Sequence, residues 1–152
     1  MDVRAKLAEL NLTLPVATLP LAAYVPAVRT GNLVFTAGQL PIVDGKIAYT
    51  GKVGGPVTPE QAKEMAQICI LNALAAVELV APVDSIVKVV RVVGYVNGVA
   101  GFIAAPGVVN GASELLIHIF GDANGKHARS AIGVAELPLD APVEIELTVE
   151  VL

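Results

Sequence analysis

The C-terminal segment from Val143 to Val151 alternates strictly between apolar and polar side chains. Valine, isoleucine or leucine occupies every odd-numbered position, and glutamate or threonine occupies every even-numbered one. Successive side chains of an extended strand point to opposite faces of a sheet, so this segment predicts a strand with one buried face and one polar face. Helices are then expected over the buried face, and the polar face is available for self-association.

Two segments have the periodicity of helices that cover such a sheet. The first starts at Thr58-Pro59-Glu60-Gln61 and runs to about Val80. At this start, threonine caps the helix, proline takes the first helical position and glutamine returns a bond to the cap. The second predicted helix runs from Gly107 to Phe120 and is ended by Gly121. Residues 3–10 predict a further short amphipathic helix.

The remaining apolar segments predict strands. Residues 24–29 and 33–39 form a hairpin around Thr30-Gly31-Asn32, and the valine-rich residues 86–96 form a largely buried strand. Residues 128–137 precede the alternating strand. The order β-β-α-β-α-β-β predicts an α+β fold, with a mixed or antiparallel sheet that carries two helices on one face. One domain over residues 1–152 is expected, with residues 1–20 as an N-terminal extension.

Composition indicates a folded chain that hides apolar surface. Hydrophobic residues make up 55% of the 152 residues and charged residues 16%, against about 25% charged residues in typical soluble domains. Mean hydropathy is +0.69. A monomer of this size has too few charges to cover its surface, so we expect a subunit interface.

Charge and motif content exclude several classes of function. The net charge is −4, and no segment concentrates lysine and arginine, so a nucleic acid is a poor partner. Residues 92–113 carry no charge, but repeated glycines and Pro106 break the stretch into a strand end, a loop and a helix start, which argues against a membrane span. The charged N-terminus does not resemble a signal peptide, so a cytoplasmic location is expected, where the single Cys69 stays reduced.

Few residues offer chemistry on their own. His118 and His127 have no third ligand nearby, so no metal site is predicted, and Cys69 on an apolar helix face is expected to be a buried thiol. Arg129 opens a strand of small and apolar residues, and its guanidinium needs an anionic partner. That partner is either a glutamate of a neighbouring strand or the carboxylate of a ligand. Spacing alone favours the internal salt bridge.

Three motifs, in order along the chain, carry a resemblance to a known family. They are the hairpin of residues 24–41 with its Gly-Asn turn and Gly-Gln-Leu-Pro ending, Val109-Asn110 near the second helix, and Ala128-Arg129-Ser130 followed by Leu137-Pro138 and Glu144-Ile145-Glu146. Together they resemble the RidA family, also called the YjgF family, over about residues 22–151. The longer N-terminus and the Asn110–Ser113 helix start look like a distinct branch of it.

The resemblance implies a chorismate-mutase-like fold and a homotrimer with a pocket at each subunit interface. It also implies hydrolysis of reactive enamines and imines, such as 2-aminoacrylate, to a 2-keto acid and ammonia. Such a reaction needs no cofactor, because a protonated imine is already electrophilic. The expected small-molecule partner is therefore a 2-imino or 2-keto acid.

The resemblance also assigns roles to residues. Arg129 corresponds to the arginine that grips the substrate carboxylate, with further bonds from backbone groups near Arg129 and Ala131. Glu144 corresponds to the glutamate that binds or activates water, although it could only pair with Arg129. Tyr24 corresponds to a tyrosine that lines the pocket, or else is a core or interface aromatic. Asn110 corresponds to a pocket asparagine, although a helix-capping role explains it equally well.

Three departures from the family pattern leave the activity and the preferred ligand open. Ala37 and Ala131 replace polar residues of many family deaminases, and Gly133 replaces a glutamate, so the pocket is expected to favour a more apolar ligand. A non-catalytic protein that senses a keto acid or another small carboxylate is the competing interpretation, and the two differ in whether water reaches the bound carbon. The ribonuclease activity often attached to this family fits poorly with an acidic chain that has no basic groove.

Overall fold

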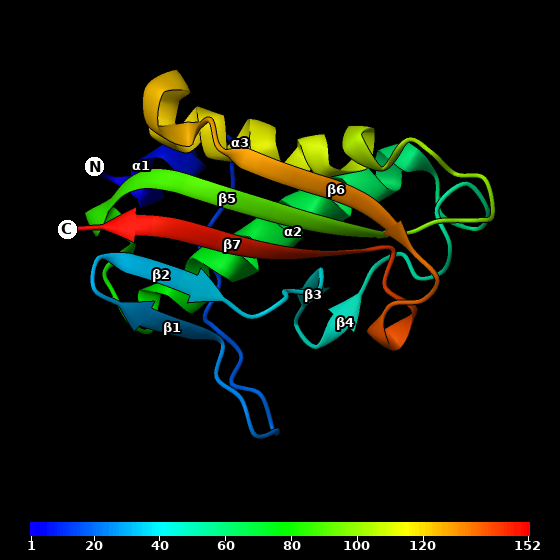
Figure 1. Cartoon of the computed structure of the whole chain (residues 1–152), viewed down its shortest axis with the longest axis horizontal. Helices are drawn as coiled ribbons and strands as arrows, with labels where there is room; N and C mark the ends of the chain where they lie inside the picture. Colours follow the sequence, from blue (N-terminus) through cyan, green and yellow to red (C-terminus); the bar gives the residue numbers. More distant parts are fainter.

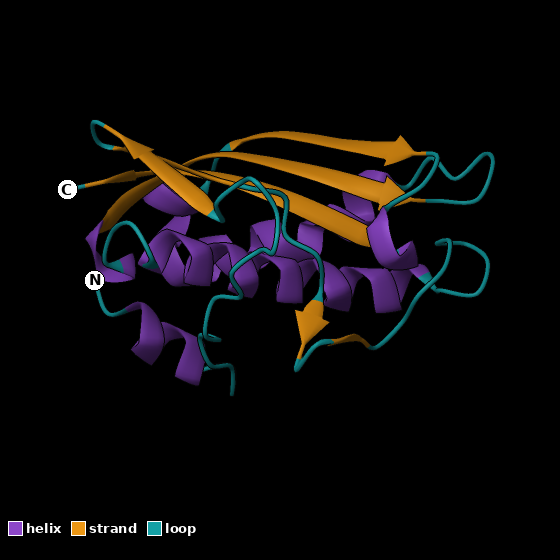
Figure 2. Cartoon of the chain, turned by 90° about the horizontal axis from the view of Figure 1, so that it is seen from below, coloured by secondary structure: helices purple, strands orange, loops and turns teal.

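A five-stranded sheet with two long helices on one of its faces forms the body of the protein (Figures 1 and 2). The computed structural model describes all 152 residues. The strand order is β1-β2-β7-β5-β6. In chain order, the helices and strands are α1 (Val3–Ala8), β1 (Ala27–Thr30), β2 (Leu33–Thr36), β3 (Ile42–Val43), β4 (Lys46–Ile47), α2 (Pro59–Glu78), β5 (Ile86–Asn97), α3 (Ala105–Gly125), β6 (Ala128–Val134) and β7 (Val143–Val151).

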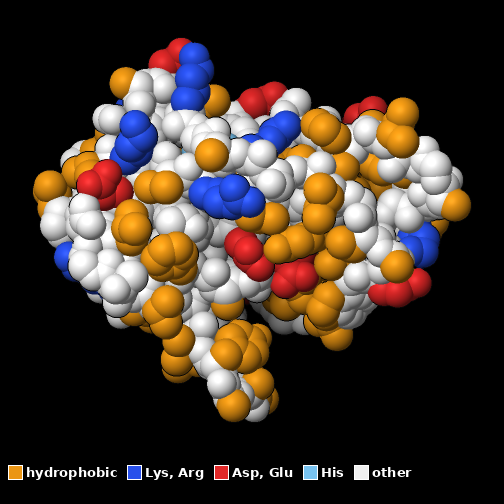
Figure 3. Space-filling model, in the orientation of Figure 1, with side chains coloured by type: hydrophobic (Ala, Val, Ile, Leu, Met, Phe, Trp, Pro, Cys, Tyr) orange, Lys and Arg blue, Asp and Glu red, His pale blue; other side chains and the backbone are white.

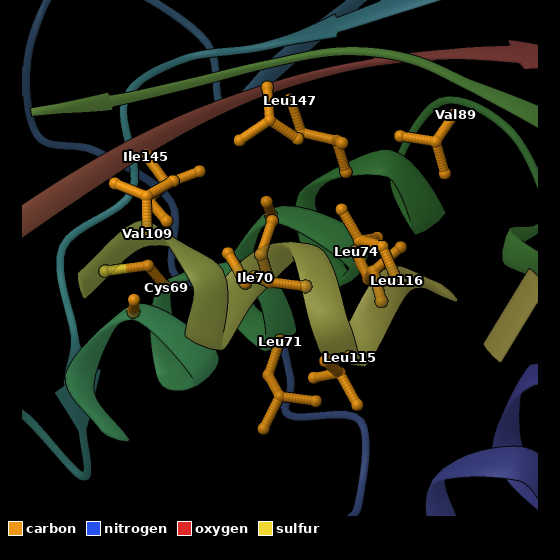
Figure 4. Packing of buried hydrophobic residues seen from close by; sticks show 14 of the residues in the cluster. Cys69, Ile70, Leu71, Leu74, Val89, Val109, Leu115, Leu116, Ile145 and Leu147 are labelled. Atoms are coloured by element: carbon orange, nitrogen blue, oxygen red, sulfur yellow. The ribbon is translucent and has the colours of Figure 1, made fainter. Parts of the chain in front are cut away.

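The alternation of β7 organises the core, as predicted. Its odd-numbered residues are buried against α2 and α3, while its even-numbered residues are only partly buried. Figure 4 shows Ile145 and Leu147 above the buried side chains of the two helices, among them Ile70 and Leu116. The capping box of α2 is also present, because Gln61 N donates to Thr58 Oγ1 at 3.1 Å and Thr58 N donates to Gln61 Oε1 at 2.9 Å.

The α+β prediction is confirmed, with shifted boundaries. Helix α3 begins at Ala105 rather than Gly107, and it breaks at Gly121 as predicted, where φ is 74°, before a last turn to Gly125. The charge-free residues 92–113 are divided between β5, a loop and α3. No helix combines the length and the apolar character that a membrane crossing requires.

One prediction about neighbouring strands is wrong. We expected the strand that contains Arg129 to lie next to the strand of glutamates, but β5 lies between β6 and β7. The pairing of β5 with β6 is parallel, with Val92 opposite Arg129, and β7 is antiparallel to both β5 and β2. After the crossover through α3, the chain forms β6 beside β5 and parallel to it. The other edge of β5 is then left for β7.

The face of the sheet opposite the helices mixes acidic and apolar side chains. Glu144 and Glu146 lie there, and Tyr95 donates from its hydroxyl to Glu146 Oε1 at 3.2 Å. Exposed Phe35 and Ile132 share this face through their register with β7 and β5. Figure 3 shows acidic groups near its centre, with basic and hydrophobic side chains around them. The prediction that this face takes part in self-association stays a prediction.

Two glycines allow the layers to approach closely. At Gly94 of β5, a Cβ would collide with Val109 of α3. At Gly111 of α3, a Cβ would collide with the backbone carbonyl oxygen of Lys63 in α2. A backbone carbonyl within a helix cannot move aside as the end of a flexible side chain can, so Gly111 sets the spacing between the two helices.

We predict that Gly111→Ala destabilises the protein, because the added methyl group overpacks the α2–α3 contact. The expected loss is about 1–3 kcal/mol of unfolding free energy, measured by urea denaturation. Gly107→Ala is the matched control, since Gly107 lies on the same helix with open space at its Cβ position, and it is expected to be neutral or stabilising by about 0.5–1 kcal/mol. Equal midpoints for the two variants would contradict the role of Gly111.

Candidate functional site

Arg129 points toward α3, on the helix side of the sheet. Its Nη1 donates to Asn110 Oδ1 at 2.8 Å and to Ser113 Oγ at 3.3 Å. No carboxylate of the chain lies within salt-bridge distance of it. The internal salt bridge that spacing favoured is therefore wrong, because the glutamates of β7 lie on the opposite face of the sheet and one strand away.

Asn110 and Ser113 are one helical turn apart on α3, so both side chains face β6. Asn110 lies well inside α3, which begins at Ala105, so the capping interpretation of this residue is wrong. The structure instead brings Asn110 to the Arg129 guanidinium, and its role in a substrate pocket stays a prediction. Both partners of Arg129 are uncharged, and its positive charge has no counterpart within the chain.

A serine and a histidine that the sequence analysis did not select extend this cluster. Ser113 Oγ lies 2.9 Å from His127 Nε2, and His127 Nδ1 lies 2.6 Å from the backbone oxygen of Gly125. In the sequence, Asn110 and Ser113 are three residues apart on a helix, and His127 and Arg129 are two residues apart on a strand. Neither spacing indicates that this helix and this strand are neighbours. We name Asn110, Ser113, His127 and Arg129 the arginine cluster.

The histidine of the arginine cluster is biased toward its neutral form. Partial burial lowers the pKa of His127 below its ordinary value of 6.5. The bond to the Gly125 carbonyl acts in the opposite direction, and the positive charge of Arg129 lowers the pKa further. At neutral pH the ring therefore has one protonated nitrogen and one that accepts a hydrogen bond.

Glu144 lies in a second group of residues, on the open face of the sheet. It is opposite Tyr95 in β5, and its Oε1 occupies the space where a side chain on Gly38 would stand. The segment around Gly38 is held to β7 by paired backbone bonds between Gln39 and Ile145, at 2.8 and 3.0 Å. Burial, followed by the negative charge of Glu146, raises the pKa of Glu144 above its ordinary value of 4.5.

Tyr24 lies apart from Arg129, in the segment that precedes β1. Its side chain is 57% exposed, which rules out a place in the core of the chain. It lines a cavity of about 160 Å³ together with Gly38, Gln39 and Asn72. Arg129, Asn110 and Glu144 do not line that cavity. We name Gly38 and Glu144, which are in contact, the glutamate cluster.

Within one chain, the structure unites only part of the predicted site. Arg129 and Asn110 are in contact, and Ala131, on the same face of β6, packs against the core. The glutamate cluster lies on the other side of the sheet. Arg129 and Glu144 therefore do not form a common pocket within a single chain.

Comparisons with known proteins identify the relatives of the chain. The model of the family described as "Endoribonuclease L-PSP" matches residues 15–151. "Protein TCP17" of Trypanosoma cruzi is 36% identical over 149 residues, which cover 97% of this chain and 93% of that protein. A Dermatophagoides farinae protein named 2-iminobutanoate/2-iminopropanoate deaminase is 32% identical over 135 residues, which cover 89% of this chain and 91% of that one.

A solved structure shows the same fold. The crystal structure of Atu1372 from Agrobacterium tumefaciens, a protein described as having unknown function, superposes with a TM-score of 0.90 at 42% identity. The match covers 98% of this chain and 92% of that one.

We predict that Glu144→Gln changes how stability depends on pH. A raised pKa means that the folded protein binds this proton more tightly than the unfolded chain does, so ionising Glu144 destabilises the fold as the pH rises above about 4.5. Relative to the wild type, the variant should gain unfolding free energy progressively between pH 4.5 and neutral pH. Chemical denaturation across this range tests it. Glu64→Gln, at an exposed position of α2, controls for the loss of one negative charge, and an identical profile for both variants contradicts the prediction.

Proposed function

The chain belongs to the endoribonuclease L-PSP family, also known as the RidA or YjgF family, and on this basis we propose that it hydrolyses reactive enamines and imines. The substrates are 2-imino acids of the 2-aminoacrylate type, and the products are a 2-keto acid and ammonia. We place this activity in the cytoplasm. The name of the Dermatophagoides farinae relative, at 32% identity, supports this class of substrate.

The observation that carries the proposal is the uncompensated charge of Arg129. Asn110 and Ser113 engage only its Nη1, so the edge formed by Nε and Nη2 has no partner within the chain. This edge matches a carboxylate, which binds a guanidinium through two parallel hydrogen bonds. A partly buried arginine with neutral partners is therefore suited to an anionic ligand, and a carboxylate is the group that every 2-imino acid carries.

Binding the carboxylate orients the rest of the substrate. The carboxylate and the adjacent C=N bond of a 2-imino acid are conjugated and tend toward one plane, so two bonds at the carboxylate fix the direction from which water reaches the imine carbon. Glu144 is proposed as the base that takes the proton from this water. Its raised pKa brings the carboxylate closer to the working pH, which favours proton transfer in both directions.

We propose that a second copy of the chain completes the site. Arg129 and Asn110 come from one subunit of a homotrimer, and Glu144 and Tyr24 come from its neighbour. Two features support this arrangement. Strand β6 is an edge strand with no partner on its outer side, and exposed Ile132 accompanies the acidic residues on the open face of the sheet.

The pocket is proposed to prefer aliphatic imines. Ala131 follows Arg129 on the same face of β6 and contributes a methyl group against the core. Ala37 precedes Gly38, the glycine that makes room for Glu144. Neither position supplies a hydroxyl or thiol, so 2-iminobutanoate is expected to be a better substrate than an imine with a polar side chain.

We predict that the protein accelerates release of 2-keto acid from imines generated in situ by an amino-acid oxidase. Arg129→Ala should lower kcat/KM by at least about tenfold, since charge-assisted hydrogen bonds contribute about 1.5–3 kcal/mol. Arg129→Lys should recover only part of the activity, because an ammonium cannot make the parallel pair of bonds.

Arg4→Ala is the matched control for this experiment. Arg4 lies on α1, is exposed and pairs with Glu78, so its loss should leave turnover unchanged. If the folded protein binds a 2-keto acid but accelerates none of the small or aliphatic imines, the enzymatic proposal fails and carboxylate sensing takes its place.

A further inference from the structure

The Gly125 carbonyl determines which group donates and which accepts in each hydrogen bond of the arginine cluster. The Gly125 carbonyl can only accept, so His127 Nδ1 carries the proton in the bond at 2.6 Å. In the neutral ring, Nε2 is then an acceptor, and Ser113 donates its hydroxyl proton to it at 2.9 Å. Arg129 donates to Ser113 Oγ at 3.3 Å. The serine oxygen therefore keeps one lone pair for a hydrogen bond from a ligand or a water.

Ser113 and His127 lie beside the guanidinium to which we assign the substrate carboxylate. Ser113 contacts the same guanidinium nitrogen that Asn110 holds, on the same side of the sheet. Both Ser113 and His127 are partly accessible rather than buried in the core. The arrangement has the parts of a proton relay: a hydroxyl beside the guanidinium, an imidazole bonded to that hydroxyl, and a carbonyl that sets the tautomer of the imidazole.

We propose that Ser113 and His127 form a proton relay that acts on the substrate held by Arg129, and that this relay promotes the second step of imine hydrolysis. The inference rests on the proposed function and adds a base on the arginine side of the site, supplied by the same chain as Arg129. Ser113 is the residue that touches the substrate. His127 acts through it.

The proton balance assigns a separate task to each base. In the first step, water adds to the carbon of the protonated imine and loses one proton to Glu144, which gives a neutral carbinolamine. In the second step, Glu144 returns this proton to the amino nitrogen as the C–N bond breaks, and ammonia leaves with the bonding electrons. The hydroxyl proton of the carbinolamine passes to Ser113, whose own proton passes to His127 Nε2, and the C=O bond of the keto acid forms.

The charges around His127 suit a group that accepts a proton during the reaction and releases it afterwards. Partial burial and the Arg129 charge keep its pKa low, so the ring is neutral before the second step and releases its proton to solvent or to ammonia afterwards. On the flanking segment, Lys126 is paired with Asp122 at 2.6 Å. Of the charged groups nearby, Arg129 is the one that affects the ring.

The elements packed against His127 present uncharged partners. Helix α3 offers the Ser113 hydroxyl, and Glu114, the next residue of α3, is paired with Lys63 of α2 at 2.9 Å. Arg91 of β5 is directed to the other face of the sheet, where it donates to Ser130 Oγ at 3.2 Å. No carboxylate of the chain therefore competes with Ser113 for the histidine.

The test compares Ser113→Ala, Ser113→Thr, His127→Asn and His127→Ala in the imine assay. Loss of the hydroxyl or of the imidazole should lower kcat by at least about 100-fold, as is typical for loss of general acid–base catalysis. KM should stay within about twofold, because Arg129 still holds the carboxylate. Ser113→Thr keeps the hydroxyl and should recover most of the rate, and added imidazole should partly restore kcat in His127→Ala.

A titration of the wild-type protein provides a test without turnover. The chain has 2 histidines, so NMR of labelled imidazoles follows both, with His118, which lies against Lys6 and Glu9, as the internal control. Pyruvate bound to Arg129 should neutralise the nearby charge and raise the pKa of His127.

The outcomes separate the two proposals. If Arg129→Ala abolishes activity but His127→Asn and Ser113→Ala keep the wild-type kcat, the relay is wrong and the proposed function stands. If the wild type itself forms no keto acid above background, the proposed function fails and the relay fails with it. A His127 signal that does not respond to bound pyruvate also overturns the relay.

Discussion

The central position of β7 in the sheet determines where every candidate residue lies. Its apolar side chains hold α2 and α3 against one face, so its glutamates must occupy the opposite face. Arg129, on edge strand β6, has its partners on α3 and therefore lies on the helix side. The same alternation that buries the core thus separates the arginine cluster from the glutamate cluster within one chain, and a pocket that uses both needs a second copy.

The partly buried charge of Arg129, which has no anionic partner within the chain, connects the fold to the proposed chemistry. Taking a guanidinium out of water is unfavourable unless an anion or good acceptors replace the lost hydration. Asn110 and Ser113 supply acceptors for one nitrogen only, and the remaining edge is left for a carboxylate. A ligand that binds there adds the missing charge, so binding stabilises the folded protein through the site itself. The neutral His127 beside it avoids placing a second positive charge in the same region.

The local patterns of the sequence were sufficient to predict the helices and strands, but not which strands lie next to each other in the sheet. The alternation of β7, the capping box at Thr58 and the break at Gly121 depend on residues close in sequence, and all were predicted. The position of β5 between β6 and β7 depends on how two long connections pack, which no local pattern specifies. Short β3 and β4 flank Asp44-Gly45, and each has too few residues to show periodicity.

The candidate site divides in the same way. Motif resemblance pointed to Arg129, Asn110, Glu144 and Tyr24, whereas Ser113 and His127 emerge only when α3 and β6 are placed side by side.

The most direct test of a carboxylate site at Arg129 is calorimetric titration of the wild-type protein with 2-oxobutanoate and with 2-butanone, which has the same chain length but no carboxylate. We expect the keto acid to bind and the ketone not to bind. Equal binding of the two, or binding of neither, would contradict a site built around the charge of Arg129.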